Sequence, residues 1–184
     1  MLQASMLKLP MLKRVTPYLL LIISGLSLTL AYAPFSMWAL TIPAFAIAIR
    51  QVIKLKHKPF FAGWLFGMAW FGAGISWVHV SIADFGGLPL VASVGLMALL
   101  CAYLALYPAL AFTLTAKYFK PQLWPLALPL CWVFAEWLRS WMLSGFPWLS
   151  LGYSQINGPL AGFAPMIGET GITALLVISA ASLA

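Results

Sequence analysis

Long apolar runs, separated by short polar or proline-containing breaks, fill most of the sequence. Residues 18–33 (YLLLIISGLSLTLAYA) are typical, because they are apolar on every side and do not alternate with polar residues. A transmembrane helix needs about 20 such residues to cross a bilayer core of about 30 Å, whereas a membrane β-strand has about ten residues of alternating polarity. The pattern therefore predicts an all-α membrane protein.

The breaks divide the chain into a bundle of about six predicted transmembrane helices. Proline and glycine mark several breaks, because proline removes a backbone donor and turns the chain. Residues 1–16 form an N-terminal segment, and residues 17–184 form the membrane domain. A segment rich in Gly, Pro and Trp, residues 139–164, is expected at the membrane surface, where tryptophan rings lie among head groups. The approximate spans are 17–33, 37–53, 60–80, 88–116, 122–138 and 165–184.

The basic residues predict the orientation of this bundle. Three precede the first span, four lie at or after the end of the second and two follow the fourth, so nine of the ten fall on one side. Cytoplasmic loops of membrane proteins are enriched in Lys and Arg. The N-terminus is therefore expected in the cytoplasm. The turns near Pro34, Asp84 and Trp148 then face the opposite, periplasmic or extracellular, side.

Composition supports a membrane location and argues against a nucleic-acid partner. The chain is 64% hydrophobic and 7% charged, with a mean hydropathy of +1.00. An average soluble domain has about 45–50% apolar and about 25% charged residues. The net charge is +7, but the basic residues form short clusters between apolar runs, which is the topology signal of a membrane protein. We therefore expect membrane lipids as partners and no nucleic acid.

The three acidic residues are the first candidates for chemistry. An ionisable residue within a span costs about 2.5–3.5 kcal/mol on insertion scales, so each needs an explanation. Asp84 is expected in a polar turn. Glu136 and Arg139 stand three positions apart, so they share a helical face and can form a structural ion pair, with a direct substrate contact as the alternative. Glu169 follows a glycine, where a carboxylate can cap the positive end of a helix.

The other reactive residue types form no set that indicates a reaction. Cys101 and Cys131 lie within apolar runs, without metal-ligand spacing and without an adjacent His or acid, so both are interpreted as apolar residues. His79 closes a span beside Trp77, where an interfacial role is favoured over catalysis. The residues by themselves therefore predict no metal site, no cofactor and no catalytic group.

The end of the sequence predicts that the protein is longer than this chain. From Gly171 to Ala184 only 14 residues remain, and they end without a charged or aromatic anchor at the membrane surface. We therefore expect the chain to be a fragment, with more of the protein beyond Ala184.

Four segments carry a resemblance to a known family. They are residues 30–35 (LAYAPF), 74–87 (GISWVHVSIADFGG), 136–139 (EWLR) and 145–155 (GFPWLSLGYSQ). In order and spacing they resemble apolipoprotein N-acyltransferase, over nearly the whole chain. The resemblance implies a multi-pass protein of the bacterial inner (cytoplasmic) membrane. It also implies transfer of an acyl chain from a phospholipid donor to the N-terminal diacylglyceryl-cysteine of a lipoprotein acceptor.

The resemblance further implies how the reaction is divided along the protein. The family transfers the acyl group through a thioester on a cysteine, and it places a Glu, Lys and Cys triad in a nitrilase-like domain beyond residue 184. This chain is then expected to contain no catalytic residue and to be inactive alone. The candidates for contact with lipid or with the catalytic domain are Trp148, Phe146, Pro147, Tyr153 and Gln155. A purely structural turn is the alternative for these residues.

Two other classes of function stay open. A small membrane transporter is one, because helices interrupted by Gly and Pro also build transport sites. Its polar pathway has little support, since the spans contain few ionisable residues and the two halves show no internal repeat. A non-catalytic membrane assembly protein is the other. It is distinguished from an enzyme fragment by whether the reading frame continues past Ala184.

Overall fold

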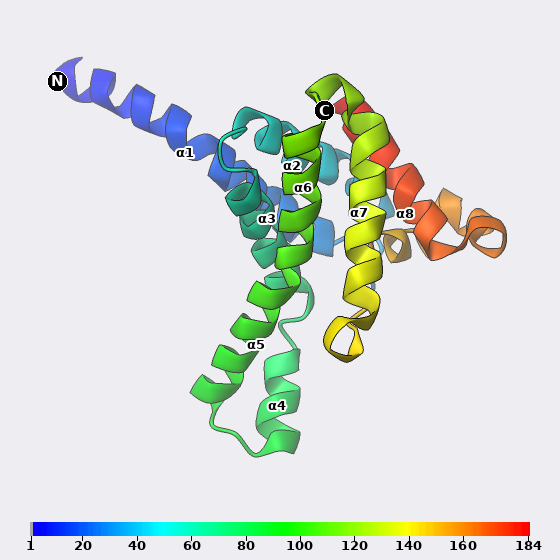
Figure 1. Cartoon of the computed structure of the whole chain (residues 1–184). Coiled ribbons are helices and arrows are strands. Elements are labelled where there is room, and N and C mark those ends of the chain that lie inside the picture. Colours follow the sequence, from blue (N-terminus) through cyan, green and yellow to red (C-terminus); the bar gives the residue numbers. More distant parts are fainter. Residues whose placement is uncertain (1) are drawn as a thin grey trace.

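The computed structural model describes residues 2–184, with side chains from Val15 onward, and this part of the chain consists of helices and turns without a strand (Figure 1). The all-α prediction is confirmed. The predicted cytoplasmic segment, residues 1–16, falls mostly outside the described side chains. The α-helices are α1 Leu2–Thr29, α2 Thr41–Lys54, α3 Pro59–Gly74, α4 Val78–Gly86, α5 Leu90–Leu104, α6 Leu106–Tyr118, α7 Trp124–Trp141 and α8 Ala164–Leu183. Short 3-10 helices are η1 Trp38–Leu40, η2 Pro121–Leu123, η3 Met142–Ser144, η4 Leu151–Gln155 and η5 Pro159–Phe163.

Aromatic side chains form the centre of the bundle. Helix α3 packs against α1 and α6, and α7 packs against α6 and α8. The ring centroids of Phe45 and Trp132 are 4.6 Å apart, those of Phe66 and Phe112 are 6.2 Å apart, and Trp70 stacks on Trp132 at 6.2 Å. These five side chains are at most 2% exposed. Aromatic pairs at such distances stabilise a core beyond the area they bury, which fits the many Phe and Trp residues of the sequence.

Two glycines let α3 and α6 approach closely. A Cβ atom added to Gly63 would lie 2.8 Å from the Cα of Ala109, and one added to Gly67 would lie 2.8 Å from the Cα of Ala105. Small residues at such positions allow backbone-level packing, which drives helix association in lipid. The glycine-rich pattern of this segment therefore serves the α3–α6 interface.

Not every predicted span is one straight helix. In the described residues, two stretches are long and apolar enough to cross a membrane: Leu90–Tyr118, which joins α5 and α6, and Pro159–Leu183, which joins η5 and α8. Helices α3 and α4 form a third candidate that is bent by 55°. The predicted span 60–80 is therefore broken after Gly74, and Asp84 lies within α4 instead of a turn. The number of about six spans stays a prediction.

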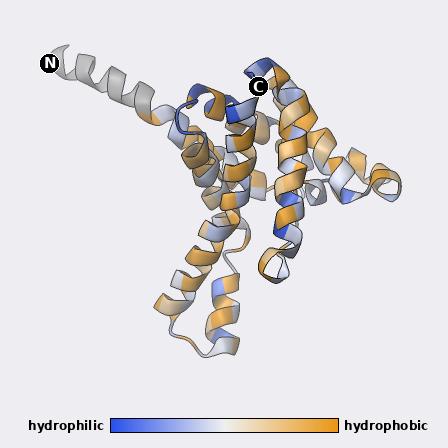
Figure 2. Cartoon of the chain, in the orientation of Figure 1, coloured by the Kyte–Doolittle hydropathy of each residue, from blue (hydrophilic) through white to orange (hydrophobic). Residues whose placement is uncertain are grey.

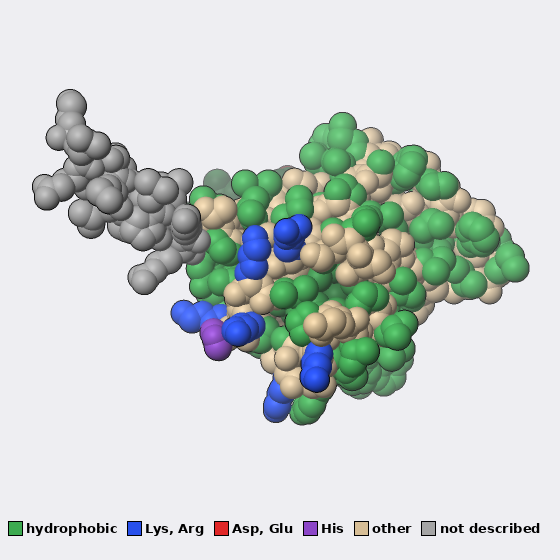
Figure 3. Space-filling view, turned by 90° about the horizontal axis from the view of Figure 1, so that it is seen from above, with side chains coloured by type: hydrophobic (Ala, Val, Ile, Leu, Met, Phe, Trp, Pro, Cys, Tyr) green, Lys and Arg blue, Asp and Glu red, His purple; other side chains and the backbone are tan. Residues whose placement is uncertain are grey.

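The surface is apolar along the helices and basic at one end. Figure 2 shows apolar residues on the outside of the projecting α4–α5 hairpin, where Phe85 is 91% and Val91 86% exposed. Large exposed apolar surfaces of this kind mark contact with a membrane or a partner. Figure 3 looks onto the opposite end, where exposed lysines gather from two loops. They are Lys54, Lys56 and Lys58, in the last turn of α2 and the loop after it, and Lys117 and Lys120, in the last turn of α6 and the loop after it.

The clustering brings together basic residues that are far apart in the sequence. The α2–α3 and α6–α7 loops lie at the same end of the molecule, which is the end seen in Figure 3, and the α4–α5 hairpin points away from it in Figure 1. Lipid-facing helices with cations at one end have the charge asymmetry expected for a cytoplasmic face. The cytoplasmic position of the N-terminus remains a prediction that this arrangement supports.

Candidate functional site

The segment from Met142 to Gly158 joins α7 to the α8 region and has an unusual backbone. Its φ angles are 51° at Leu143, 71° at Ser144 and 59° at Leu149. Residues other than glycine rarely adopt this left-handed backbone conformation, and each one costs of order 1 kcal/mol or more of folding free energy. Contacts from elsewhere in the protein must therefore hold this segment, which we call the α7–α8 loop.

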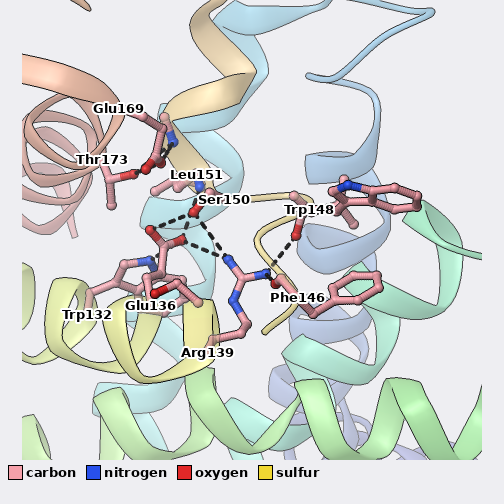
Figure 4. A network of polar contacts seen from close by, with 12 residues as sticks. Trp132, Glu136, Arg139, Phe146, Trp148, Ser150, Leu151, Glu169 and Thr173 are labelled. Atoms are coloured by element: carbon pink, nitrogen blue, oxygen red, sulfur yellow. Dashed lines mark hydrogen bonds and ion pairs between the residues drawn. The ribbon is translucent and has the colours of Figure 1, made fainter. Parts of the chain in front are cut away.

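Arg139, in the last turn of α7, supplies the strongest of these contacts (Figure 4). Its side chain is only 2% exposed. Nη1 donates hydrogen bonds to the main-chain carbonyls of Phe146, at 2.9 Å, and Trp148, at 2.6 Å. The guanidinium carbon also lies 5.4 Å from the centre of the Phe71 ring. Hydrogen bonds from a charged donor are about twice as strong as neutral ones, so Arg139 fixes the first half of the loop on the bundle.

Glu136 lies one turn before Arg139 and holds the next part of the loop. One carboxylate oxygen is 3.6 Å from Nη2 of Arg139, so the structure contains this ion pair. The carboxylate also accepts hydrogen bonds from the Leu151 N–H at 3.1 Å, the Ser150 hydroxyl at 3.1 Å and the Trp132 indole N–H at 3.2 Å. A buried ion pair is favourable only when such additional bonds satisfy the remaining polar atoms. The pair therefore anchors the loop and not merely the end of α7.

Helix α8 holds the loop from the other side. The Gly152 N–H donates to Oε1 of Glu169 at 3.2 Å and to the hydroxyl of Thr173 at 2.8 Å, and that hydroxyl also donates to Glu169 at 2.8 Å. The backbone of α8 is interrupted at Gly168, which has a φ of 67°. Glu169 directly follows this interruption, and its carboxylate accepts hydrogen bonds both from the loop and from Thr173 of its own helix.

The turn after α1 and the segment before α2 complete the attachment. The Tyr32 hydroxyl lies 3.2 Å from the carbonyl oxygen of Leu149 and 3.3 Å from that of Ser150, and it donates to them. The Gln155 side-chain amide donates to the carbonyl of Trp38 at 3.3 Å. Gln155 is only 3% exposed, so this predicted contact residue is bonded within the protein.

The other predicted contact residues reach the surface of the loop. Trp148 is 51% and Tyr153 is 43% exposed, Pro147 is exposed and Phe146 is partly buried. The Trp148 ring lies 5.0 Å from that of Trp77 and 5.5 Å from that of Phe146. Buried charged side chains therefore hold the backbone of the loop, and the aromatic side chains of the loop face outward.

The cysteines and histidine lie apart from this network. Cys101 is buried in α5 and Cys131 is partly buried in α7. His79 lies in α4, and its ring nitrogen contacts the carbonyl of Ser76. Within the described residues, no group of three or more His, Cys, Asp or Glu side chains could hold a metal ion. The polar network of Figure 4 is thus built around two glutamates and one arginine.

Several members of the network could not be recognised in the sequence. Tyr32 reaches it from the turn after α1, which is more than 100 positions from its partners in the chain, and Ser150 lies in an irregular loop whose backbone path the sequence does not show. Trp132 and Thr173 each stand four positions from one of the glutamates. Residues four apart are neighbours on a helix, so this spacing is the one signal that could have indicated them.

Comparison with known proteins identifies the family. Residues 24–182 match the family described as apolipoprotein N-acyltransferase N-terminal domain. A relative named apolipoprotein N-acyltransferase, from Shewanella oneidensis, is 47% identical over 171 residues, which cover 88% of this chain and 32% of the relative. Relatives of the same name are 45% identical in Vibrio parahaemolyticus, over 87% of this chain and 32% of theirs, and 41% in Nitrosomonas europaea, over 87% and 33%.

The matched region covers most of this chain but only part of each relative. The chain spans about a third of the length of the curated relatives it matches. The family match, in contrast, includes every helix of the bundle in whole or part, together with the α7–α8 loop and its anchors. This chain therefore belongs to the apolipoprotein N-acyltransferase N-terminal domain family.

Proposed function

We propose that this chain is the membrane part of an inner-membrane enzyme that transfers an acyl chain from a phospholipid to the N-terminal diacylglyceryl-cysteine of lipoproteins. The observation that carries the proposal is the family match over residues 24–182, together with the name shared by the relatives. The apolar outer surface of the helices supports it, because both proposed substrates are lipids that reside in a membrane. The chain then has its basic end in the cytoplasm and its α7–α8 loop on the periplasmic side.

The proposed reaction has two steps. A cysteine thiolate attacks the ester of the phospholipid, which forms a thioester and releases a lysophospholipid. The amine of the lipoprotein cysteine then attacks the thioester, so that an amide forms and the thiol is regenerated. We propose that the Glu, Lys and Cys of this chemistry belong to the part of the family outside the matched third. This chain alone is then inactive, because neither Cys101 nor Cys131 is the nucleophile.

The α7–α8 loop is proposed to face the lipid or the catalytic part of the enzyme. Its exposed side chains, Trp148, Tyr153 and Pro147, with Phe146 beside them, are of the apolar and aromatic types that suit a membrane interface. Arg139 supports this role, because it holds the backbone of the loop in one place. The lipid-contact proposal rests on these four residues, since Gln155 is buried.

Activity of two proteins tests the proposal. One is the 184-residue chain, and the other is a chimera in which the chain replaces the matched third of the Shewanella oneidensis relative. Acyl transfer from phospholipid to a diacylglyceryl-cysteine peptide is measured for both, and only the chimera is expected to turn over. Turnover by the chain alone that disappears in Cys101→Ala or Cys131→Ala would contradict the proposal, as would a folded but inactive chimera.

A matched pair of variants in the chimera tests the role of the loop. Trp148→Ala should lower turnover, whereas Trp141→Ala should leave it nearly unchanged. Both tryptophans are about half exposed, at 51% and 54%, but only Trp148 lies in the loop. Equal effects of the two substitutions would show that the loop has no special contact with substrate or with the catalytic part.

A further inference from the structure

One hydrogen-bond donor in the aromatic core has no acceptor. The Trp70 side chain of α3 is 1% exposed, and no group in the described part of the chain accepts a hydrogen bond from its indole N–H. The indole of Trp132, which stacks on Trp70, differs because it donates to Glu136 at 3.2 Å. Buried polar groups are nearly always hydrogen-bonded, either to protein or to ordered water. The Trp70 indole therefore needs a partner that the described chain does not supply.

Trp70 lines a small cavity between α3, α6 and α7. Tyr107 of α6 and Ala135, Glu136 and Arg139 of α7 also line it. The volume of the cavity is about 10 Å³, and the smallest cavities that hold a water molecule have about 10–15 Å³. All of its lining side chains except that of Glu136 are buried. The cavity therefore has room for one water molecule and for nothing larger.

The hydroxyl of Tyr107 is an acceptor on the wall of this cavity. The Tyr103 hydroxyl donates to the main-chain carbonyl of Met142 at 3.4 Å, and the two tyrosine hydroxyls are hydrogen-bonded to each other. Because the hydrogen of Tyr103 points to Met142, the hydrogen between the two tyrosines comes from Tyr107. A hydroxyl oxygen that donates its hydrogen can still accept. The Tyr107 oxygen is therefore able to accept a hydrogen bond.

The carboxylate of Glu136 is a second acceptor. Its Oε2 accepts from the Ser150 hydroxyl at 3.1 Å, and a carboxylate has about four lone-pair sites on its two oxygens. Arg139 balances the charge of Glu136, so the cavity suits a neutral molecule better than an ion. With the donor of Trp70, the wall offers three polar partners, which is the typical number for a buried water.

We propose that one ordered water molecule occupies this cavity and bridges α3, α6 and α7. It accepts a hydrogen bond from the Trp70 indole and donates to the Tyr107 oxygen and to the Glu136 carboxylate. Glu136, which holds the α7–α8 loop, is thereby also linked to α3. The site is independent of the proposed acyl transfer, because the water satisfies buried groups of the bundle whatever reaction the enzyme performs.

Magnetisation transfer between water and the Trp70 indole N–H tests the proposal. The 184-residue chain, isotope-labelled at its tryptophan indoles and otherwise deuterated, is studied by NMR in detergent, and Trp70→Phe identifies the Trp70 signal by its loss. We expect a cross-peak to water in laboratory-frame and rotating-frame Overhauser spectra, with the sign of dipolar contact and not of proton exchange. The Trp64 indole, which donates to the carbonyl of Ala102 at 3.1 Å, should show none. Absence of the cross-peak at Trp70 would overturn the proposal.

Two matched variants of α7 place the water in the cavity. Ala135 lines the cavity, so Ala135→Val should fill it and abolish the Trp70 cross-peak. Ala127 is another buried alanine of α7 that is not part of the cavity, and Ala127→Val should keep the cross-peak. A folded Ala135→Val protein with an undiminished cross-peak would contradict the proposal.

A third variant separates a bound water from the hydroxyl of Tyr107. A hydroxyl proton that exchanges with solvent relays magnetisation from water to a nearby indole N–H, without any water in the cavity. Tyr107→Phe removes that route but leaves the water its bonds to Trp70 and Glu136. The cross-peak should therefore persist in this variant. Its complete loss in a folded Tyr107→Phe protein would show that the signal came through the hydroxyl and that the proposal is wrong.

Discussion

Arg139 donates a hydrogen bond of 2.6 Å to the main-chain carbonyl of Trp148, nine positions further along the chain. The arginine is buried, whereas the indole of Trp148 is half exposed and lies against Trp77. A charge inside the bundle thus determines where an aromatic side chain stands on the surface. Removing that charge should therefore affect both stability and the position of the loop.

Replacing Arg139 is expected to be strongly destabilising. In Arg139→Leu, the Glu136 carboxylate stays buried without its counter-charge, and the loop carbonyls lose their donor. Breaking a buried ion pair from one side costs about 3–5 kcal/mol. Thermal unfolding in detergent measures the loss, and Arg50→Leu is the control because Arg50 is exposed on α2. An equal loss in both variants would contradict the anchoring role of Arg139.

The double variant tests whether the two charges depend on each other. Glu136→Leu with Arg139→Leu should be less destabilised than the sum of the single variants, because no uncompensated charge remains in it. The folded yield in detergent should likewise be higher for the double variant than for either single one. Strictly additive losses would mean that the ion pair contributes no coupling energy.

Tyr32→Phe is expected to cost about 1 kcal/mol, the usual value of a hydrogen bond to a neutral group. The ring remains in place, so the loss reports on the hydroxyl contacts with Leu149 and Ser150 alone. Tyr18→Phe is the matched control, because Tyr18 packs on Phe61 through its ring. If both variants unfold at the wild-type temperature, the Tyr32 hydroxyl does not hold the loop.

Two glycines of α3 should respond in opposite directions to the same substitution. Gly67→Ala places a methyl group against the backbone of Ala105, and overpacking of this kind costs about 1–3 kcal/mol. Gly72 has no atom within 4 Å of an added Cβ, so Gly72→Ala should stabilise the helix by up to about 1 kcal/mol. Unfolding temperatures of the two variants measure the difference. If Gly67→Ala unfolds at the wild-type temperature, α3 and α6 do not pack as closely as described.

The orientation is tested with single cysteines in a chain whose Cys101 and Cys131 are replaced by alanine. Asp84→Cys should react with a membrane-impermeant thiol reagent added to intact cells, and Lys56→Cys should react only after the cells are opened. The expectation rests on the concentration of lysines in the two loops of Figure 3. Reaction of Lys56→Cys from outside would reverse the orientation and move Trp148 to the cytoplasmic side.

Much of the architecture could be predicted from the sequence because lipid imposes a simple rule. A chain with such long apolar runs must satisfy its backbone polar groups internally, and helices do so segment by segment. The concentration of basic residues at one end follows from the order of the runs. The ion pair of Glu136 and Arg139 could also be predicted from the sequence, since residues three positions apart on one helix are neighbours whatever the rest of the fold.

What the sequence could not show depends on segments that return from a distance. The break between α3 and α4 lies where the Leu149 side chain packs against Gly74, a contact between residues 75 positions apart. In the same way, the sequence predicts Gln155 as a contact residue at the surface, but its side chain is buried and donates a hydrogen bond to the carbonyl of Trp38.

The sequence by itself determined an all-helical, apolar chain with a basic end, because period and composition act locally. Only the tertiary structure decided that Glu136 and Arg139 hold the α7–α8 loop, and that Glu169 accepts a hydrogen bond from Gly152 of the same loop. Both outcomes depend on which backbone groups of the loop meet the ends of α7 and α8. That choice follows from the packing of the whole bundle, since a buried charge takes its partners from whatever segment reaches it.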